Sequence, residues 1–203
     1  MSNSGEGIFS IIEIGKDYFD KAKYDYNVVL NIDTISITKR DGQIKIPIRW
    51  IKDSNLIYKD KNFPNNEEAN ITYNYLGYYR DIDMYLIETR YYEAIEYCFV
   101  SPNGSITTIW GKPIVSNDGK YFACFRPYGL EGEPNGIQIW KVKSDLVLYE
   151  GLYKIFEMNQ LLFSPINCCW DINGSLLMQA EKMQSYYYPK EPNETYYLKL
   201  EFK

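Results

Sequence analysis

Carboxylates and tyrosines are the side chains of this 203-residue chain whose types and spacing could carry chemistry, because the chain contains no histidine. The absence of imidazole removes Ser-His-Asp and Cys-His activation of a nucleophile, and every His-ligated zinc or iron site. Paired carboxylates can still cleave a glycosidic bond, and Glu88 and Glu93 flank tyrosines on which a sugar could stack. These tyrosines are Tyr85, Tyr91 and Tyr92. Such pairs arise by chance in any acidic β protein, so glycan cleavage is an alternative and not the main hypothesis.

Neither a metal site nor a cofactor site is predicted. Residues 131–136 (Glu-Gly-Glu-Pro-Asn-Gly) have the acidic spacing of a calcium loop, but Val142 takes the twelfth position, where a bidentate glutamate is needed. A loop between strands explains this segment better. The cysteines, which form no CxxC pair, are Cys98, Cys124, Cys168 and Cys169. We expect buried free thiols, with a Cys98–Cys124 bridge as the alternative in an exported chain.

The negative charge is concentrated in one stretch of the chain. The net charge is −5, from 22 basic and 27 acidic residues, which is the wrong sign for a nucleic-acid binder. Residues 62–100 alone carry seven acidic residues against Arg80 and Arg90. The seven are Glu67, Glu68, Asp81, Asp83, Glu88, Glu93 and Glu96. This stretch is either a solvated face that maintains solubility or an acidic face for a basic partner.

Tyrosine is unusually abundant: the chain has 21 Tyr, and aromatic residues make up 17% of it. Some tyrosines are consecutive, as at 78–79, 91–92 and 186–188, and neighbouring residues of a strand point to opposite faces. Some of these rings are therefore expected on the surface, where tyrosine beside carboxylate is typical of protein recognition. The predicted partner-binding residues are Asp81, Asp83, Glu88, Tyr91, Tyr92 and Glu93.

The elements that must position these residues are predicted to be strands, because Tyr and Phe favour the half-buried surface of a sheet. Only residues 16–25 have helical spacing, so at most one short N-terminal helix is expected. Asp41-Gly42 predicts a tight turn that joins residues 34–38 and 43–48 in a hairpin. Residues 59–69 are polar and contain Pro64, which predicts a long loop.

A loose internal repeat follows from residue 70 onward, in which Asn-Gly and Asp-Gly pairs predict turns at Gly104, Gly119 and Gly174. The middle unit predicts strands over 113–116, 121–125, 136–142 and 145–149, which form a four-stranded antiparallel meander of the size of a propeller blade. Similar patterns predict blade-like units over 70–111, 112–151 and 152–203, after an irregular β unit over 1–69. We expect one all-β domain over residues 1–203, built as a propeller-like or partial-propeller array of such meanders.

Two segments carry a resemblance to known repeats. Ile114-Val115-Ser116-Asn117-Asp118-Gly119-Lys120-Tyr121-Phe122-Ala123 resembles the Ser-Pro-Asp-Gly-Lys turn and strand of TolB-type propellers. Gly136-Ile137-Gln138-Ile139-Trp140 resembles the third strand of Trp-Asp-repeat blades. Asn117 stands where those propellers have proline. The resemblance implies blade architecture and a binding platform, and it implies no activity.

These observations favour a non-catalytic, acidic, Tyr-rich module that binds a basic protein. In size, acidity and lack of histidine the chain is similar to bacterial immunity or inhibitor proteins that cap a toxin. An exported glycan-binding or glycan-cleaving protein is the alternative. The N-terminal residues lack the pattern of a secretory signal, and no apolar run approaches the roughly 20 residues that cross a bilayer. A cytoplasmic location is therefore expected, with export as the alternative if a leader has been removed.

Overall fold

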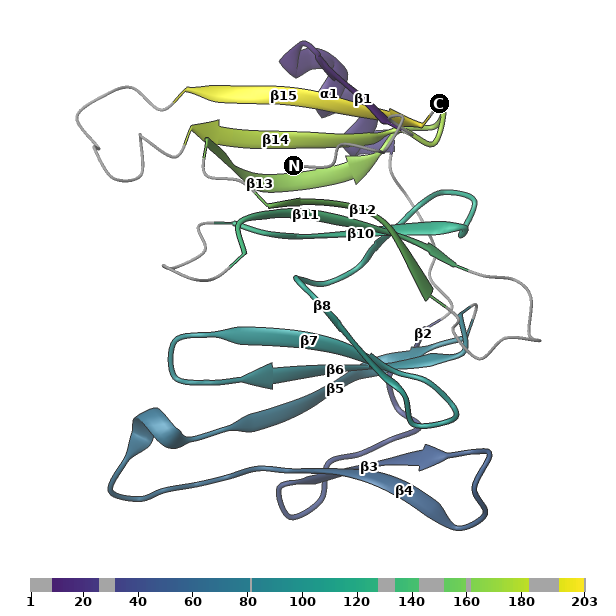
Figure 1. Ribbon diagram of the computed structural model, residues 1–203, viewed down its shortest axis with the longest axis vertical. Helices are drawn as coiled ribbons and strands as arrows, with labels where there is room; N and C mark the ends of the chain where they lie inside the picture. Colours follow the sequence, from purple (N-terminus) through teal and green to yellow (C-terminus); the bar gives the residue numbers. More distant parts are fainter. Residues whose placement is uncertain are drawn as a thin grey trace, which may run out of the picture. The chain divides into compact units, whose positions relative to one another are not determined.

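The computed structural model describes residues 9–25, 32–80, 82–127, 134–142, 152–159, 162–182 and 194–202 (Figure 1). Strands make up 59% of this part and helices 8%, which confirms the all-β prediction. The strands form antiparallel sheets, none of which closes on itself. The chain divides into two compact units. The first contains residues 1–29, 113–141 and 154–203, and the second contains residues 30–112 and 142–153.

The first unit contains two four-stranded sheets and one helix. One sheet has the order β1(Phe9–Glu13), β15(Thr195–Phe202), β14(Leu176–Lys182), β13(Phe163–Trp170). The other has the order β12(Leu152–Asn159), β11(Gly136–Val142), β10(Tyr121–Arg126), β9(Ile114–Val115), and its outer ends at Val142 and Leu152–Tyr153 are assigned to the second unit. Helix α1(Lys16–Asp25) has the bounds that the sequence predicts.

Both faces of the sheet that contains β13 are covered. Cys168 and Cys169 are adjacent in this strand, so they point to opposite faces. Cys168 packs with Ile137, Ile139 and Trp170 in the core shared with the other sheet. Cys169 packs beneath α1, where Phe19 is 1% exposed. Burial of a phenylalanine contributes about 1.5–3 kcal/mol, so Phe19 helps to hold the helix on the sheet.

The same tight turn occurs three times. Its first residues are Ser101, Ser116 and Asp171, and in each turn the carbonyl of that residue accepts a hydrogen bond from the N–H of a glycine three positions later, at 2.9, 2.9 and 3.1 Å. The glycines are Gly104, Gly119 and Gly174, with φ of 87°, 70° and 80°. Glycine adopts this left-handed conformation without a steric penalty. The Asn-Gly and Asp-Gly turns predicted from the sequence are therefore confirmed.

The second unit contains a five-stranded sheet and a separate hairpin. The sheet has the order β2(Ile32–Asp33), β5(Thr72–Tyr79), β6(Met84–Arg90), β7(Ile95–Val100), β8(Ile106–Ile109). The hairpin pairs β3(Gln43–Ile48) with β4(Ser54–Lys59), and the short 3-10 helix η1(Glu67–Ala69) lies in the long loop that follows. Ile44 and Ile46 of the hairpin pack against Tyr85, Ile87 and Val100 of the sheet.

The predicted hairpin between residues 34–38 and 43–48 is corrected by the structure. The Asp41-Gly42 turn is present, with φ of 49° and 69°, and Arg40 and Gln43 exchange two backbone hydrogen bonds across it. Residues 34–37 are bends, however, because Asp33 Oδ1 accepts hydrogen bonds from the N–H groups of residues 35 and 36. Strand β3 pairs with β4 instead.

The predicted strand over residues 145–149 lies outside the described residues. The fourth position in the sheet of β9–β11 is taken by β12, which follows the predicted strand in sequence. In the part of the chain that the structure describes, no helix is long and apolar enough to span a membrane.

Candidate protein-binding surface

The predicted partner-binding residues do not form one patch. Asp83 directly precedes β6 and Tyr91 directly follows it. A strand of seven residues is about 20 Å long, so these two residues lie at opposite ends of the sheet. Asp81 lies outside the described residues. Asp83 therefore does not share a patch with Tyr91, Tyr92 and Glu93, and Glu88 lies in the strand between them.

Asp83 is neutralised within its own unit. It lies in the turn between β5 and β6 with φ of 55°, and its carboxylate accepts hydrogen bonds from the Arg49 guanidinium and the Tyr78 hydroxyl. The Arg49 guanidinium carbon also lies 5.4 Å from the centre of the Tyr78 ring. Burial, followed by the hydrogen bond to Asp83, raises the pKa of Tyr78. This end of the sheet offers a basic partner a paired carboxylate and not a free one.

Glu88 lies in the interior, which corrects its predicted place on an acidic surface. It is 2% exposed, and its carboxylate accepts hydrogen bonds from Arg90 Nε at 2.5 Å, Asn74 Nδ2 at 3.0 Å and the Tyr97 hydroxyl at 3.2 Å. Burial opposes the ionisation of Glu88, but these hydrogen bonds outweigh it and lower the pKa of the carboxyl. Glu88 is therefore a buried carboxylate whose hydrogen bonds are made to Arg90, Asn74 and Tyr97 and not to a partner protein.

Tyr91, Tyr92 and Glu93 lie together at the turn between β6 and β7. The N–H of Tyr91 donates to the carbonyl of Ala94 at 2.8 Å, which holds the turn. Tyr92 is 61% exposed and Tyr91 39% exposed. The Tyr91 hydroxyl donates to Glu96 Oε2 at 3.0 Å, and burial together with this bond raises the pKa of Tyr91 to about 12. We define the hairpin tip as Tyr91, Tyr92, Glu93, Ile95 and Glu96.

More negative charge lies at the same end of the sheet. Thr72 pairs with Arg90, and Arg90 pairs with Ile95, so the start of β5 and the preceding η1 lie at the end where the hairpin tip lies (left in Figure 1). Glu67 and Glu68 of η1 are exposed. Among the described residues, none of Glu67, Glu68 and Glu93 forms an ion pair, whereas Asp83 and Glu88 do.

The predicted partner-binding residues did not include Ile95 and Glu96, although Glu96 belongs to the acidic stretch. The signal that could have found them is the length of the Tyr91–Ala94 turn, since a turn this tight places Ile95 and Glu96 directly after the two tyrosines. Residues 131–133 of the possible calcium loop lie outside the described residues.

The cysteines are free thiols, as the sequence predicts. Cys124, Cys168 and Cys169 are buried and Cys98 is partly buried. Burial raises the pKa of Cys98 and of Cys168, and it raises the pKa of Cys169 to about 11. A thiol with a raised pKa is a poor nucleophile at neutral pH, so these groups act as small apolar side chains.

Comparison of the chain with family models, with curated proteins and with solved structures found no match.

Proposed function

We propose that the protein is a non-catalytic module that binds a basic protein through the hairpin tip, as a bacterial immunity or inhibitor protein does. The observation that carries this proposal is the combination of exposed Tyr91 and Tyr92 with carboxylates that form no ion pair among the described residues. Tyrosine supplies a large contact area at low entropic cost, and the carboxylates select a basic partner.

The two kinds of side chain have different roles in this proposal. The exposed carboxylates attract the partner over a distance set by the screening length, about 8–10 Å at physiological salt. They are Glu67, Glu68, Glu93 and Glu96. The tyrosines then bury their rings in the complex. Tyr91 is already oriented by its hydrogen bond to Glu96, so less side-chain freedom is lost when it is buried.

We also propose that the sheets are propeller-like blades. Support comes from the antiparallel meanders of β9–β12 and β5–β8 and from the turn that recurs at Ser101, Ser116 and Asp171. A crystal structure with the sheets arranged radially about one axis would support this proposal. Sheets stacked as an ordinary sandwich would overturn it.

The binding proposal is tested by capture from an extract of bacteria that carry the gene, with the purified chain immobilised. We expect a basic protein that is retained by the wild type and by a charge-matched control, and lost with Glu93→Gln/Glu96→Gln. The control is Asp17→Asn/Asp53→Asn, which removes two exposed carboxylates elsewhere; Asp53 has φ of 58°, a conformation that asparagine also adopts. Equal loss of the partner with both double variants would contradict a role for the hairpin tip.

Glycan binding is the second candidate, because the exposed ring of Tyr92 is a surface on which a sugar can stack. Glycan cleavage with Glu88 as the general acid is disfavoured, since a general acid needs a raised pKa and the pKa of Glu88 is lowered. A glycan array probed with the wild type and with Tyr92→Ala separates the two candidates. Glycan signals that vanish with Tyr92→Ala, without capture of a protein, would favour this second function.

A further inference from the structure

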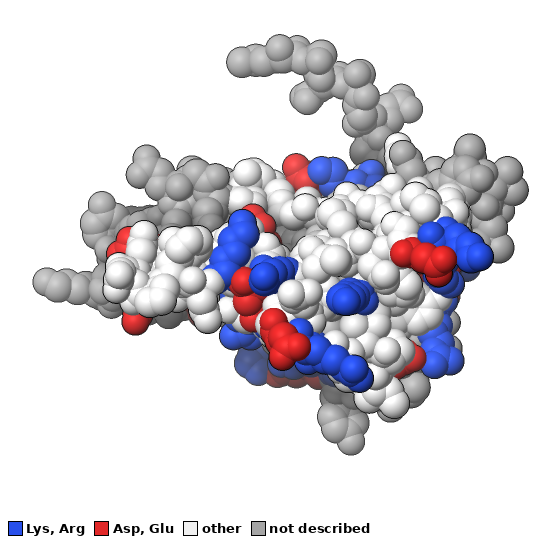
Figure 2. Space-filling view, turned by 90° about the horizontal axis from the view of Figure 1, so that it is seen from below, with Lys and Arg blue, Asp and Glu red and all other residues white. Residues whose placement is uncertain are grey.

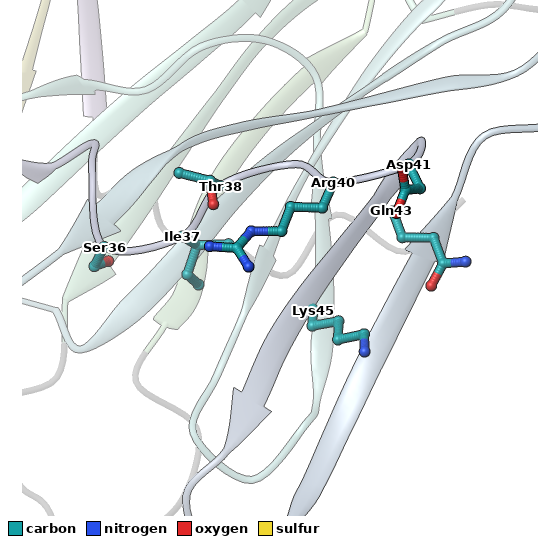
Figure 3. A pocket seen from close by; sticks show the side chains of 7 residues that line it. All are labelled: Ser36, Ile37, Thr38, Arg40, Asp41, Gln43 and Lys45. Carbon is teal, nitrogen blue, oxygen red and sulfur yellow. The ribbon is translucent and has the colours of Figure 1, made fainter.

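A cavity lies between the two arms of the opened Asp41-Gly42 hairpin. Arg40 and Gln43 pair once across the turn, and then residues 36–38 diverge from β3. The space between the arms has a volume of about 430 Å³, within the range of small-molecule sites. We call it the β3 slot. Its lining residues are Ser36, Ile37, Thr38, Arg40, Asp41, Gln43 and Lys45 (Figure 3).

The backbone of β3 is open on the side of the slot. Gln43 directs its N–H and C=O to Arg40, and in an antiparallel strand the groups of every second residue face the same side. The N–H and C=O of Lys45 therefore face the slot, and within the described residues they have no backbone partner there. Pro47, two positions further on, has no N–H, so Lys45 is the one residue of Gln43, Lys45 and Pro47 that offers the slot both a free donor and a free acceptor. The slot thus suits a short ligand better than an added strand.

The charge around the slot is positive. Residues 39–61 contain seven Lys and Arg against three Asp, in contrast to the acidic stretch that follows. The Lys39 ammonium forms an ion pair with Asp60 Oδ2 at 2.5 Å and donates a hydrogen bond to the carbonyl oxygen of Tyr73 at 2.9 Å. Among the described residues, Arg40 and Lys45 have no carboxylate partner. Figure 2 shows Lys and Arg side chains on the outer side of this hairpin, some next to Asp or Glu and some alone.

The two ends of the slot differ in the charge of their side chains. The Arg40 side chain extends back over residues 36–38 towards Ile37, while Asp41 lies at the turn beside Gln43 (Figure 3). Lys45 extends from β3. The positive charges of Arg40 and Lys45 attract an anionic group to the slot, although the two side chains extend in different directions in Figure 3. The backbone N–H of Lys45 is an additional donor. The carboxylate of Asp41 repels a second anion at the turn and favours hydrogen-bond donors there.

We propose that the β3 slot binds a small ligand that carries one oxyanion, a carboxylate or a phosphate, and hydrogen-bond donors at its other end. Arg40 and the backbone N–H of Lys45 hold the oxyanion, and the Lys45 ammonium adds positive charge at the rim. Asp41 with Gln43 receives the donors. Ile37 supplies the apolar wall. This site is distinct from the hairpin tip in its residues and in the sign of its charge, so it does not depend on the function proposed for the tip.

The test is a titration of the full ¹⁵N-labelled chain, followed by its amide chemical shifts. The probes are ribose 5-phosphate for the phosphate class, 5-aminopentanoate for the carboxylate class and ribose as the uncharged control. We expect saturable shifts confined to residues 36–45 with at least one charged probe and none with ribose. The charged probe that saturates at the lower concentration identifies the class of the oxyanion.

Two double variants decide whether Arg40 and Lys45 form the site. Arg40→Gln/Lys45→Gln should weaken the binding of the charged probe by about tenfold or more. Lys52→Gln/Lys112→Gln removes the same charge from two exposed positions of the same unit that do not line the slot, and should leave binding within about twofold. Absence of saturable shifts with both charged probes, equal weakening in the two variants, or shifts spread over all basic residues would overturn the proposal. The amide spectrum of each variant shows directly that it is folded.

Discussion

Arg90 Nε lies 2.5 Å from Glu88 Oε1, and the two residues are two positions apart on the same face of β6. Glu88 is buried and Arg90 reaches it from a more exposed position, with 56% of its side chain accessible. Asn74 and Tyr97 donate to the same carboxylate from the neighbouring strands β5 and β7. Three strands of the second unit therefore meet at one charged group.

The first prediction concerns the pH dependence of stability. The folded state lowers the pKa of Glu88 below its ordinary value near 4.5, so its contribution to stability is fully present above that value. It is lost as the pH falls through the lower, folded pKa, because the unfolded state then binds the proton more readily. Urea unfolding between pH 7 and pH 3 should show a smaller acid-dependent loss of stability in Glu88→Gln than in the wild type.

At pH 7 the same variant should be less stable by about 1–2 kcal/mol, because a charge-assisted set of hydrogen bonds becomes neutral. Glu93→Gln is the matched control, since Glu93 is exposed and forms no ion pair among the described residues. Identical pH profiles for Glu88→Gln and the wild type would show that the neighbouring residues do not lower the pKa of Glu88 in the folded state.

The second prediction concerns Trp140 on β11. As the sequence predicts, Trp140 is largely buried, with 8% exposure, and its ring stacks on Phe122 with centroids 6.0 Å apart. The Lys154 ammonium lies 5.8 Å from the ring centroid. Trp140→Ala should reduce the free energy of unfolding by about 3–5 kcal/mol, measured by urea denaturation. Trp140→Phe should recover a large part of this loss. A Trp140→Ala variant with an unchanged free energy of unfolding would show that Trp140 is not packed in the core.

The third prediction compares two glycines with positive φ. A Cβ on Gly136 would lie 1.8 Å from the carbonyl oxygen of Met158, in the adjacent strand β12, whereas a Cβ on Gly119 would have no atom within 4 Å. Gly119→Ala should therefore cost only the backbone term, about 1 kcal/mol. Gly136→Ala should cost more than about 2 kcal/mol, because β11 and β12 must separate locally.

Thermal unfolding of the two glycine variants measures this difference. Gly119→Asn should be milder than Gly119→Ala, since asparagine tolerates the left-handed region better. Equal stability of the Gly136→Ala and Gly119→Ala variants would show that the approach of β12 to Gly136 is not as close as described.

The fourth prediction concerns the binding kinetics of the hairpin tip with the captured partner. Glu93→Gln/Glu96→Gln should lower the association rate constant and reduce its dependence on salt, because these carboxylates steer the encounter. Tyr91→Ala/Tyr92→Ala should mainly raise the dissociation rate constant, because buried aromatic anchors act after the encounter. Surface plasmon resonance at two salt concentrations measures both rates. An association rate constant of the wild type that does not change with salt concentration would contradict electrostatic steering.

The sequence by itself determined the local elements. The spacing of Tyr18, Phe19 and Ala22 predicted α1, and Asp-Gly and Asn-Gly pairs predicted the turns at Gly119 and Gly174. These features are predictable because helical periodicity and left-handed glycine are properties of a few neighbouring residues. The all-β class followed in the same way, from composition and from alternating strands such as Gln43–Ile48.

Only the tertiary structure decided which of the charged and aromatic residues are accessible. Glu88 and Glu93 are five positions apart and equivalent in type, yet one is buried by Asn74, Arg90 and Tyr97 while the other is exposed in a turn. Likewise, Asp41-Gly42 specifies a turn, but it does not specify the partner of β3. The strand pairs with β4 and not with residues 34–38, in the position where Ile44 and Ile46 pack against the sheet. The burial of a charged side chain and the choice of a partner strand are set by residues distant in sequence, which a local pattern does not identify.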